Sequence, residues 1–194
     1  MKLKDIKKFN PEKIAQIETE MWRAYYGHRF LKLFLLLFKI TREQFGAGYW
    51  RTFKISYFSA LAAISFRKNQ GKENQPLILK KLTKFYKNIN DISLDKFDYK
   101  KVAQLELDWW LADRYPDRYE ISRRQALANS IASLYNSDLE KFAQYADYRA
   151  QAMEMQDEAE KNKTEADWKK IEFLLVKSWV SLSEVVNGEN YVSQ

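Results

Sequence analysis

The sequence has no cysteine and only one histidine, His28. The absence of thiols excludes disulfides, thiolate metal sites and a cysteine nucleophile. A single histidine excludes the usual carboxylate-bridged di-iron bundle, which needs Glu-x-x-His on two helices. The residue three positions before His28 is Tyr25, so even one such motif is missing. The chain also has no G-x-S-x-G turn and no glycine-rich phosphate loop, and neither serine-hydrolase chemistry nor common nucleotide binding has support.

Turn-forming residues are also scarce, with five glycines and three prolines in 194 residues. An all-β fold needs many more of them, so the composition favours long helices. The longest apolar run, Leu33 to Phe38, is much too short to span a bilayer. No apolar signal segment occurs at the N-terminus. We therefore expect an all-α protein that has no transmembrane segment and is cytoplasmic.

One stretch of the chain occurs twice. Residues 8–26 read KFNPEKIAQIETEMWRAYY, and residues 96–114 read KFDYKKVAQLELDWWLADR, with eight of nineteen aligned positions identical. This similarity predicts an internal duplication of a four-helix unit. The repeats cover about 8–90 and 96–187 and are joined by a linker at 90–95. We expect one helical domain over 1–194, with about eight helices in a pseudo-twofold arrangement.

Each copy opens with a signal for a helix start. Asn10 and Asp98 are good N-cap residues, because their side chains can accept from the free N–H groups of the first turn. Pro11 suits the first helical position.

Two further expectations concern packing. Residues 49–67 are rich in alanine and are expected at the centre of the fold, and residues 1–8 are expected to fray.

Both copies place a glutamate on the apolar face of the helix. Glu18 lies within the stripe formed by Ile14, Ile17 and Met21, and Glu106 has equivalent surroundings. A carboxylate there is costly unless it is paired or hydrogen-bonded. The favoured interpretation is a buried ion pair or a cap for a neighbouring helix. One alternative is a paired-acid site for a metal or a small polar ligand, and another is a side chain that extends out to water. The candidate acid cluster comprises Glu18, Glu20, Glu106 and Asp108, flanked by Trp22, Trp109 and Trp110.

A twofold arrangement that joins the two repeated helices would bring Glu18 and Glu106 close together. Two facing carboxylates repel each other unless a cation lies between them. The sequence indicates no particular metal or cofactor. The cations considered are a metal ion and four arginines, namely Arg23, Arg42, Arg123 and Arg124.

The two halves of the chain carry opposite charge. Residues 1–90 hold 19 Lys and Arg against 6 Asp and Glu, and residues 91–194 hold 14 against 20. Either the halves attract each other on packing, or the first half keeps an exposed basic face. Lys80, Lys84 and Lys87 share one helix face by their spacing and form a candidate anion site. We expect at most weak, salt-sensitive contact with anionic polymers or membrane surfaces.

No motif in the sequence specifies a reaction. The first hypothesis is a non-enzymatic interaction or scaffold protein that binds an unknown protein partner or forms a homo-oligomer. The alternative is a small-molecule or metal-binding protein, or an enzyme, that uses Glu18 and Glu106.

Overall fold

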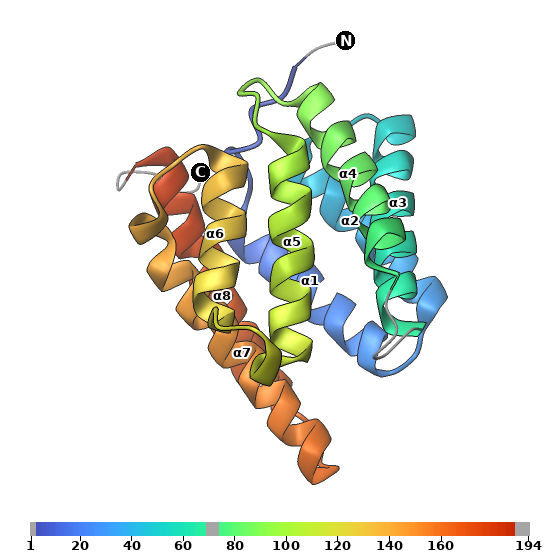
Figure 1. Ribbon diagram of the computed structural model, residues 1–194, viewed down its shortest axis with the longest axis vertical. Coiled ribbons are helices and arrows are strands. Elements are labelled where there is room, and N and C mark those ends of the chain that lie inside the picture. Colours follow the sequence, from blue (N-terminus) through green and yellow to red (C-terminus); the bar gives the residue numbers. More distant parts are fainter. Residues whose placement is uncertain (1–2, 69–73, 189–194) are drawn as a thin grey trace.

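The protein is all-α, as the sequence predicts. The computed structural model describes residues 3–68 and 74–188, and these contain eight α-helices, two short 3-10 helices and no strand (Figure 1). The elements are α1 (Pro11–Tyr26), α2 (Phe30–Phe45), α3 (Tyr49–Lys68), α4 (Gln75–Ile92), α5 (Tyr99–Arg114), η1 (Pro116–Arg118), α6 (Arg123–Tyr135), η2 (Leu139–Phe142), α7 (Ala143–Asn162) and α8 (Trp168–Asn187).

The helices pack as a closed ring. Each helix packs against the next one in the chain, and α8 packs against α1 to complete the circuit. The helix α1 therefore lies between α2 and α8, and α5 lies between α4 and α6. The two helices that carry the repeated stretch thus have matching neighbours. The internal duplication and the pseudo-twofold arrangement themselves stay predictions.

The two repeated helices begin in the same way. The Asn10 side chain accepts from the backbone N–H of Lys13 at 2.8 Å. The Asp98 side chain accepts from the backbone N–H groups of Lys100 and Lys101, at 3.0 and 3.1 Å. Pro11 takes the first helical position of α1. The predicted N-caps are therefore confirmed, and they fix where α1 and α5 enter the ring.

Buried apolar side chains from both halves of the chain form one continuous core. Ile14 and Val102 occupy equivalent places in the repeated helices and are both fully buried. Leu82 of α4 and Leu175 of α8 belong to the same cluster. Burial of this kind supplies the main driving force for folding.

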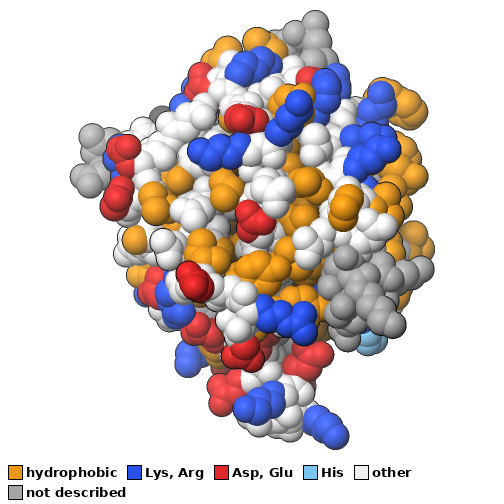
Figure 2. Space-filling view, viewed as in Figure 1, with side chains coloured by type: hydrophobic (Ala, Val, Ile, Leu, Met, Phe, Trp, Pro, Cys, Tyr) orange, Lys and Arg blue, Asp and Glu red, His pale blue; other side chains and the backbone are white. Residues whose placement is uncertain are grey.

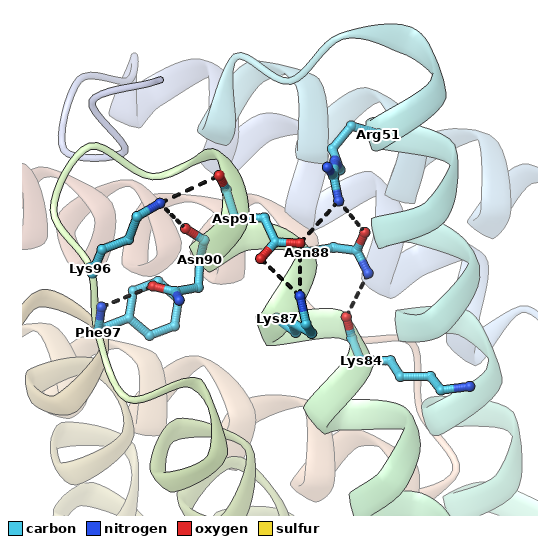
Figure 3. Close-up of polar contacts among 8 residues, drawn as sticks. All are labelled: Arg51, Lys84, Lys87, Asn88, Asn90, Asp91, Lys96 and Phe97. Carbon is cyan, nitrogen blue, oxygen red and sulfur yellow. Dashed lines mark hydrogen bonds and ion pairs between the residues drawn. The ribbon is translucent and has the colours of Figure 1, made fainter. Parts of the chain in front are cut away.

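The connection between the halves differs from the predicted linker. The helix α4 continues to Ile92, so residues 93–98 join it to α5 in place of 90–95. The Asn90 side chain accepts from the backbone N–H of Phe97 at 3.0 Å, and Lys96 donates to the backbone oxygen of Asn90 at 2.6 Å (Figure 3). These bonds hold the connection against the end of α4.

Two packing expectations from the sequence are wrong. The described part of the N-terminal arm is tied down: Ile6 is buried, and Lys4 donates its backbone N–H to Ile92 at 2.7 Å. The helix α3 does not lie at the centre. It packs against α2 and α4 at one edge of the fold (Figure 1). Its aromatic residues Tyr49, Trp50, Phe53 and Tyr57 are exposed.

The paired N-caps give a stability prediction. Asn10→Ala and Asp98→Ala should each lower the free energy of unfolding by about 1 kcal/mol, because a helix N–H loses its acceptor. Urea denaturation measures this, and the exposed Gln16→Ala variant on α1 serves as control, with a change within about 0.5 kcal/mol. A cap variant that is as stable as the parent protein would contradict the assignment.

Candidate functional site

Glu18 lies on the inner side of α1 and is almost completely buried, with 3% of its surface exposed. Both terminal nitrogens of Arg149, on α7, donate to its carboxylate, and the bond from Nη1 to Oε2 is 3.0 Å long. The indole N–H of Trp179, on α8, donates to the same Oε2 at 2.6 Å. A buried carboxylate is tolerated when it is paired and hydrogen-bonded in this way. Glu18 is thus half of a buried ion pair that joins α1 to α7.

The cation beside Glu18 is Arg149, which is not among the arginines considered from the sequence. Burial by itself would lower the pKa of Arg149, but the attraction of the Glu18 carboxylate raises it above its usual value. The guanidinium therefore stays charged. The four arginines considered have other partners: Arg23 pairs with Glu20, Arg42 lies over the Tyr49 ring, Arg123 pairs with Asp113 and Asp157, and Arg124 pairs with Asp147 and Glu154.

Glu106, the equivalent residue on α5, is held differently. Its Oε2 accepts from the Tyr86 hydroxyl at 3.0 Å and from the Ser130 hydroxyl at 3.2 Å. Its Oε1 accepts from the Trp110 indole N–H at 3.0 Å. Burial and the neighbouring Glu106 carboxylate raise the pKa of Tyr86 well above its usual value. The phenol therefore keeps its proton, and all three donors to Glu106 are neutral.

The two glutamates line the same cavity. It has a volume of about 200 Å³ and lies inside the ring, and each of the eight helices contributes at least one lining residue. Ionisable and hydroxyl groups line one part of it, including those of Tyr145 and Thr41. Aromatic and aliphatic side chains line the rest, such as those of Phe85, Leu37 and Ile131. The arrangement combines charge, hydrogen-bonding groups and apolar surface around one partly open space.

The other two acids of the predicted cluster lie elsewhere. Glu20 pairs with Lys32 at 2.7 Å, and this hydrogen bond lowers the pKa of Glu20. Asp108 accepts from Gln104 at 2.8 Å, and neither acid lines the cavity. Within residues 3–68 and 74–188, no group of three or more His, Asp or Glu side chains is arranged to hold a metal ion. The structure therefore brings together Glu18 and Glu106 but not the four acids.

The three tryptophans predicted to flank the acids have two different places. Trp109 and Trp110 both line the cavity, and their rings meet edge to face with centroids 6.3 Å apart. Trp22 is not part of the cavity lining, and the Arg149 guanidinium lies over its ring at 6.0 Å. Of these three tryptophans, Trp110 is the one that donates a hydrogen bond to an acid of the predicted cluster, Glu106.

The candidate anion site on α4 is partly neutralised. Lys87 pairs with Asp91 at 3.0 Å, and Arg51 of α3 reaches the same carboxylate at 3.3 Å (Figure 3). The Lys84 side chain points away from this pair, and its ammonium lies over the Phe58 ring at 5.2 Å (Figure 3). Lys80 is exposed. The three lysines therefore do not converge on one point.

A second hollow, of about 530 Å³, lies beside α5, α6 and α7. Its acids Asp113 and Asp157 both pair with Arg123, at 2.5 and 2.6 Å. Burial raises the pKa of Asp113, although Arg123 opposes that shift. Arg123 thus holds two of the four acids that line this hollow. The other two are Glu120 and Glu154, and Glu154 pairs with Arg124.

The sequence analysis missed an exposed apolar surface on α2 and α3. We call it the α2–α3 face, and it comprises Phe30, Leu31, Leu35, Tyr49, Trp50, Phe53 and Tyr57, all of them exposed. Hydrophobic side chains are visible along the right-hand edge of the molecule, where α3 lies, with Lys and Arg beside them (Figure 2). The signal in the sequence was the run around LFLLLF, which is apolar on every side of its helix.

Comparisons with protein-family models, curated proteins and solved structures found no match for this chain. No helix among the described residues is long and apolar enough to cross a bilayer.

The contrast between the two glutamates leads to a testable difference in stability. Glu18→Gln leaves Arg149 buried without its counter-charge and should cost about 3 kcal/mol. Glu106→Gln removes a carboxylate that has only neutral donors and should cost less than about 1 kcal/mol, because the hydroxyls of Tyr86 and Ser130 can reorient. Chemical denaturation of the two variants measures both values.

The double variant tests whether the two acids interact. Glu106 is a further anion that acts on Arg149, so its loss should matter more once Glu18 is gone. We expect the double variant to be less stable than the sum of the single changes predicts. Strict additivity, or equal costs for the two single changes, would contradict this description of the cavity.

Proposed function

We propose that this chain is a non-enzymatic interaction protein that binds the surface of an anionic membrane through the α2–α3 face. The proposal rests on the exposure of large apolar side chains on this face: 76% of Leu31 and 72% of Trp50 are accessible to solvent. Single exposed apolar residues are ordinary, whereas several of them on two neighbouring helices typically mark a contact surface.

The aromatic rings of the face form a connected row along α3. Phe53 stacks on Trp50 at 5.9 Å and on Tyr57 at 6.1 Å between centroids. Phe34 of α2 meets Phe53 edge to face at 6.2 Å, which joins the row to the other helix. Amphipathic rings such as those of Trp and Tyr favour the interface between lipid headgroups and acyl chains. The composition of the face is therefore suited to a lipid surface.

Basic residues surround these rings. Residues 29–68 hold eight Lys and Arg and one Glu, a net charge of +7. Lys39 and Lys54 are exposed, and the Lys54 ammonium lies 5.6 Å from the Trp50 ring. Long basic side chains can lay their aliphatic part along apolar surface and keep the charge at the headgroups. An anionic lipid layer attracts such groups by about 1 kcal/mol each.

A second copy of the chain fits this face less well. Two α2–α3 faces would bring positive charge against positive charge. In the acidic half, Leu94 and Phe173 are the only large exposed apolar residues among those described, so that half offers little surface to cover the rings. None of the seven residues of the face lines either hollow.

Vesicle binding by the full-length chain tests the apolar contribution. Leu35→Ser combined with Trp50→Ser should weaken co-sedimentation with mixed phosphatidylserine and phosphatidylcholine vesicles by about tenfold or more, because each lost side chain contributes at least 1.5 kcal/mol or so of burial. Phe173→Ser is the matched control, since Phe173 is also exposed (56%) but lies on α8. Absence of vesicle binding by the parent protein would overturn the proposal. A dimer that the double variant abolishes would point instead to a second copy.

The charge contribution is tested separately. Lys39→Gln combined with Lys54→Gln removes two charges worth about 1 kcal/mol each near an anionic surface, which corresponds to a loss of about 30-fold in affinity. Lys100→Gln with Lys101→Gln makes the same change in net charge on α5 and should have much less effect. Pure phosphatidylcholine vesicles should show little difference between the two double variants. Equal losses for both would mean that only the net charge of the chain matters.

A further inference from the structure

The central cavity is larger than the voids that are usual inside a small helical protein, and it is partly open to solvent. Protein cores pack about as densely as organic crystals, and most voids in them are no larger than a water molecule. An apolar cavity of about 150 Å³ is known to admit benzene. A space of about 200 Å³ therefore has room for a small organic molecule, and its polar lining determines which kind.

The charges around the cavity do not balance. Glu18 and Arg149 neutralise each other through two hydrogen bonds. Glu106 receives hydrogen bonds only from the neutral donors Tyr86, Ser130 and Trp110. A carboxylate has about four lone-pair sites, so three donors leave one acceptor position open. The cavity thus contains one half-buried carboxylate without a direct cationic partner.

Aromatic side chains surround this carboxylate. Trp110 and Tyr86 bond to Glu106 and line the cavity, and Trp109 and Phe85 line it beside them. The faces of such rings attract organic cations, and the attraction is strongest when the cation is stripped of water. A carboxylate bordered by aromatic rings therefore recognises an ammonium group through charge and through ring contacts together.

Other ligand classes fit the same lining less well. An anion would meet the uncompensated carboxylate of Glu106, because Arg149 is already occupied by Glu18. A hard metal ion needs several oxygen ligands, and the described part of the chain offers no suitable group of acids. A purely apolar molecule would leave Glu106 without a counter-charge.

We propose that the central cavity binds a small organic cation, an alkylammonium whose nitrogen lies against Glu106. Its apolar part lies among the aliphatic side chains of the cavity, which include Leu37, Leu82 and Ile131. This site is separate from the α2–α3 face, since the two share no residue. The ligand supplies the positive charge that the interior lacks.

The test compares two probes of nearly equal size that differ in charge, n-butylammonium and butan-1-ol. Each is titrated into the purified full-length protein, and calorimetry and tryptophan fluorescence report binding. We expect n-butylammonium to bind about tenfold more tightly or better, as a desolvated cation–ring contact with a carboxylate beside it implies. Equal affinity for the two probes, or no saturable binding of the ammonium, would overturn the proposal.

Variants locate the site. Glu106→Gln should abolish the preference for the ammonium, and Asp108→Asn should keep it, because Asp108 is on the same helix but outside the cavity. Ser59→Phe places a ring in the cavity, and no hydrogen bond is lost because Ser59 makes none that the structure shows. It should reduce binding of both probes at least tenfold or so. Binding that survives Ser59→Phe, or that Asp108→Asn abolishes, would place the ammonium elsewhere and refute the inference.

Discussion

The fold depends on how it accommodates a charge at its centre. Glu18 and Arg149 lie 131 positions apart in the sequence, yet they form a bidentate pair inside the ring, completed by the indole of Trp179. Three helices must be in register for these bonds to form together. Removing either charged partner strands the other in a medium of low polarity, whereas apolar packing tolerates small shifts. The ion pair therefore selects one arrangement of α1, α7 and α8 among those that the apolar core would allow.

The second glutamate shows that the same local sequence pattern can place an acid beside different hydrogen-bond partners. Glu106 occupies the corresponding place on α5, but α4 and α6 present Tyr86 and Ser130 to it in place of an arginine. The two acids therefore differ in charge balance although their own helices are alike. This difference leaves the interior with a polar cavity and an unpaired carboxylate. A core built only for stability would have used apolar residues in place of the buried pair of Glu18 and Arg149.

Two features could be inferred from the sequence: the N-caps Asn10 and Asp98, and the position of the two glutamates on apolar helix faces. Both rest on local signals, namely capping residues and helical periodicity. The sequence could not show that Arg149 is the partner of Glu18. Its helix is weakly amphipathic, with apolar residues that are mostly alanine, and nothing local marks one charged residue of α7 as buried. The α2–α3 face was missed for another reason. A long apolar run in a helix is usually buried. In the ring, however, α2 packs mainly against α1 and α3, and α3 against α2 and α4, so that Leu31 and Trp50 remain in solvent.

The helix α2 connects the two regions to which we assign binding. Leu37 and Thr41 on its inner side line the cavity, and Leu31 and Leu35 on its outer side belong to the exposed face. The polar residues Lys32, Lys39, Arg42 and Glu43 gather on one side of α2, and apolar residues cover the rest, so that the helix can contribute apolar side chains to both regions. Its inner contacts are few, since Ile40, Thr41 and Phe45 are its only buried residues. A shift of α2 on docking would change the shape of the cavity, and by thermodynamic reciprocity a ligand in the cavity would change docking by the same factor. The wide apolar surface of α2 is thus the physical basis on which the two binding events would be coupled.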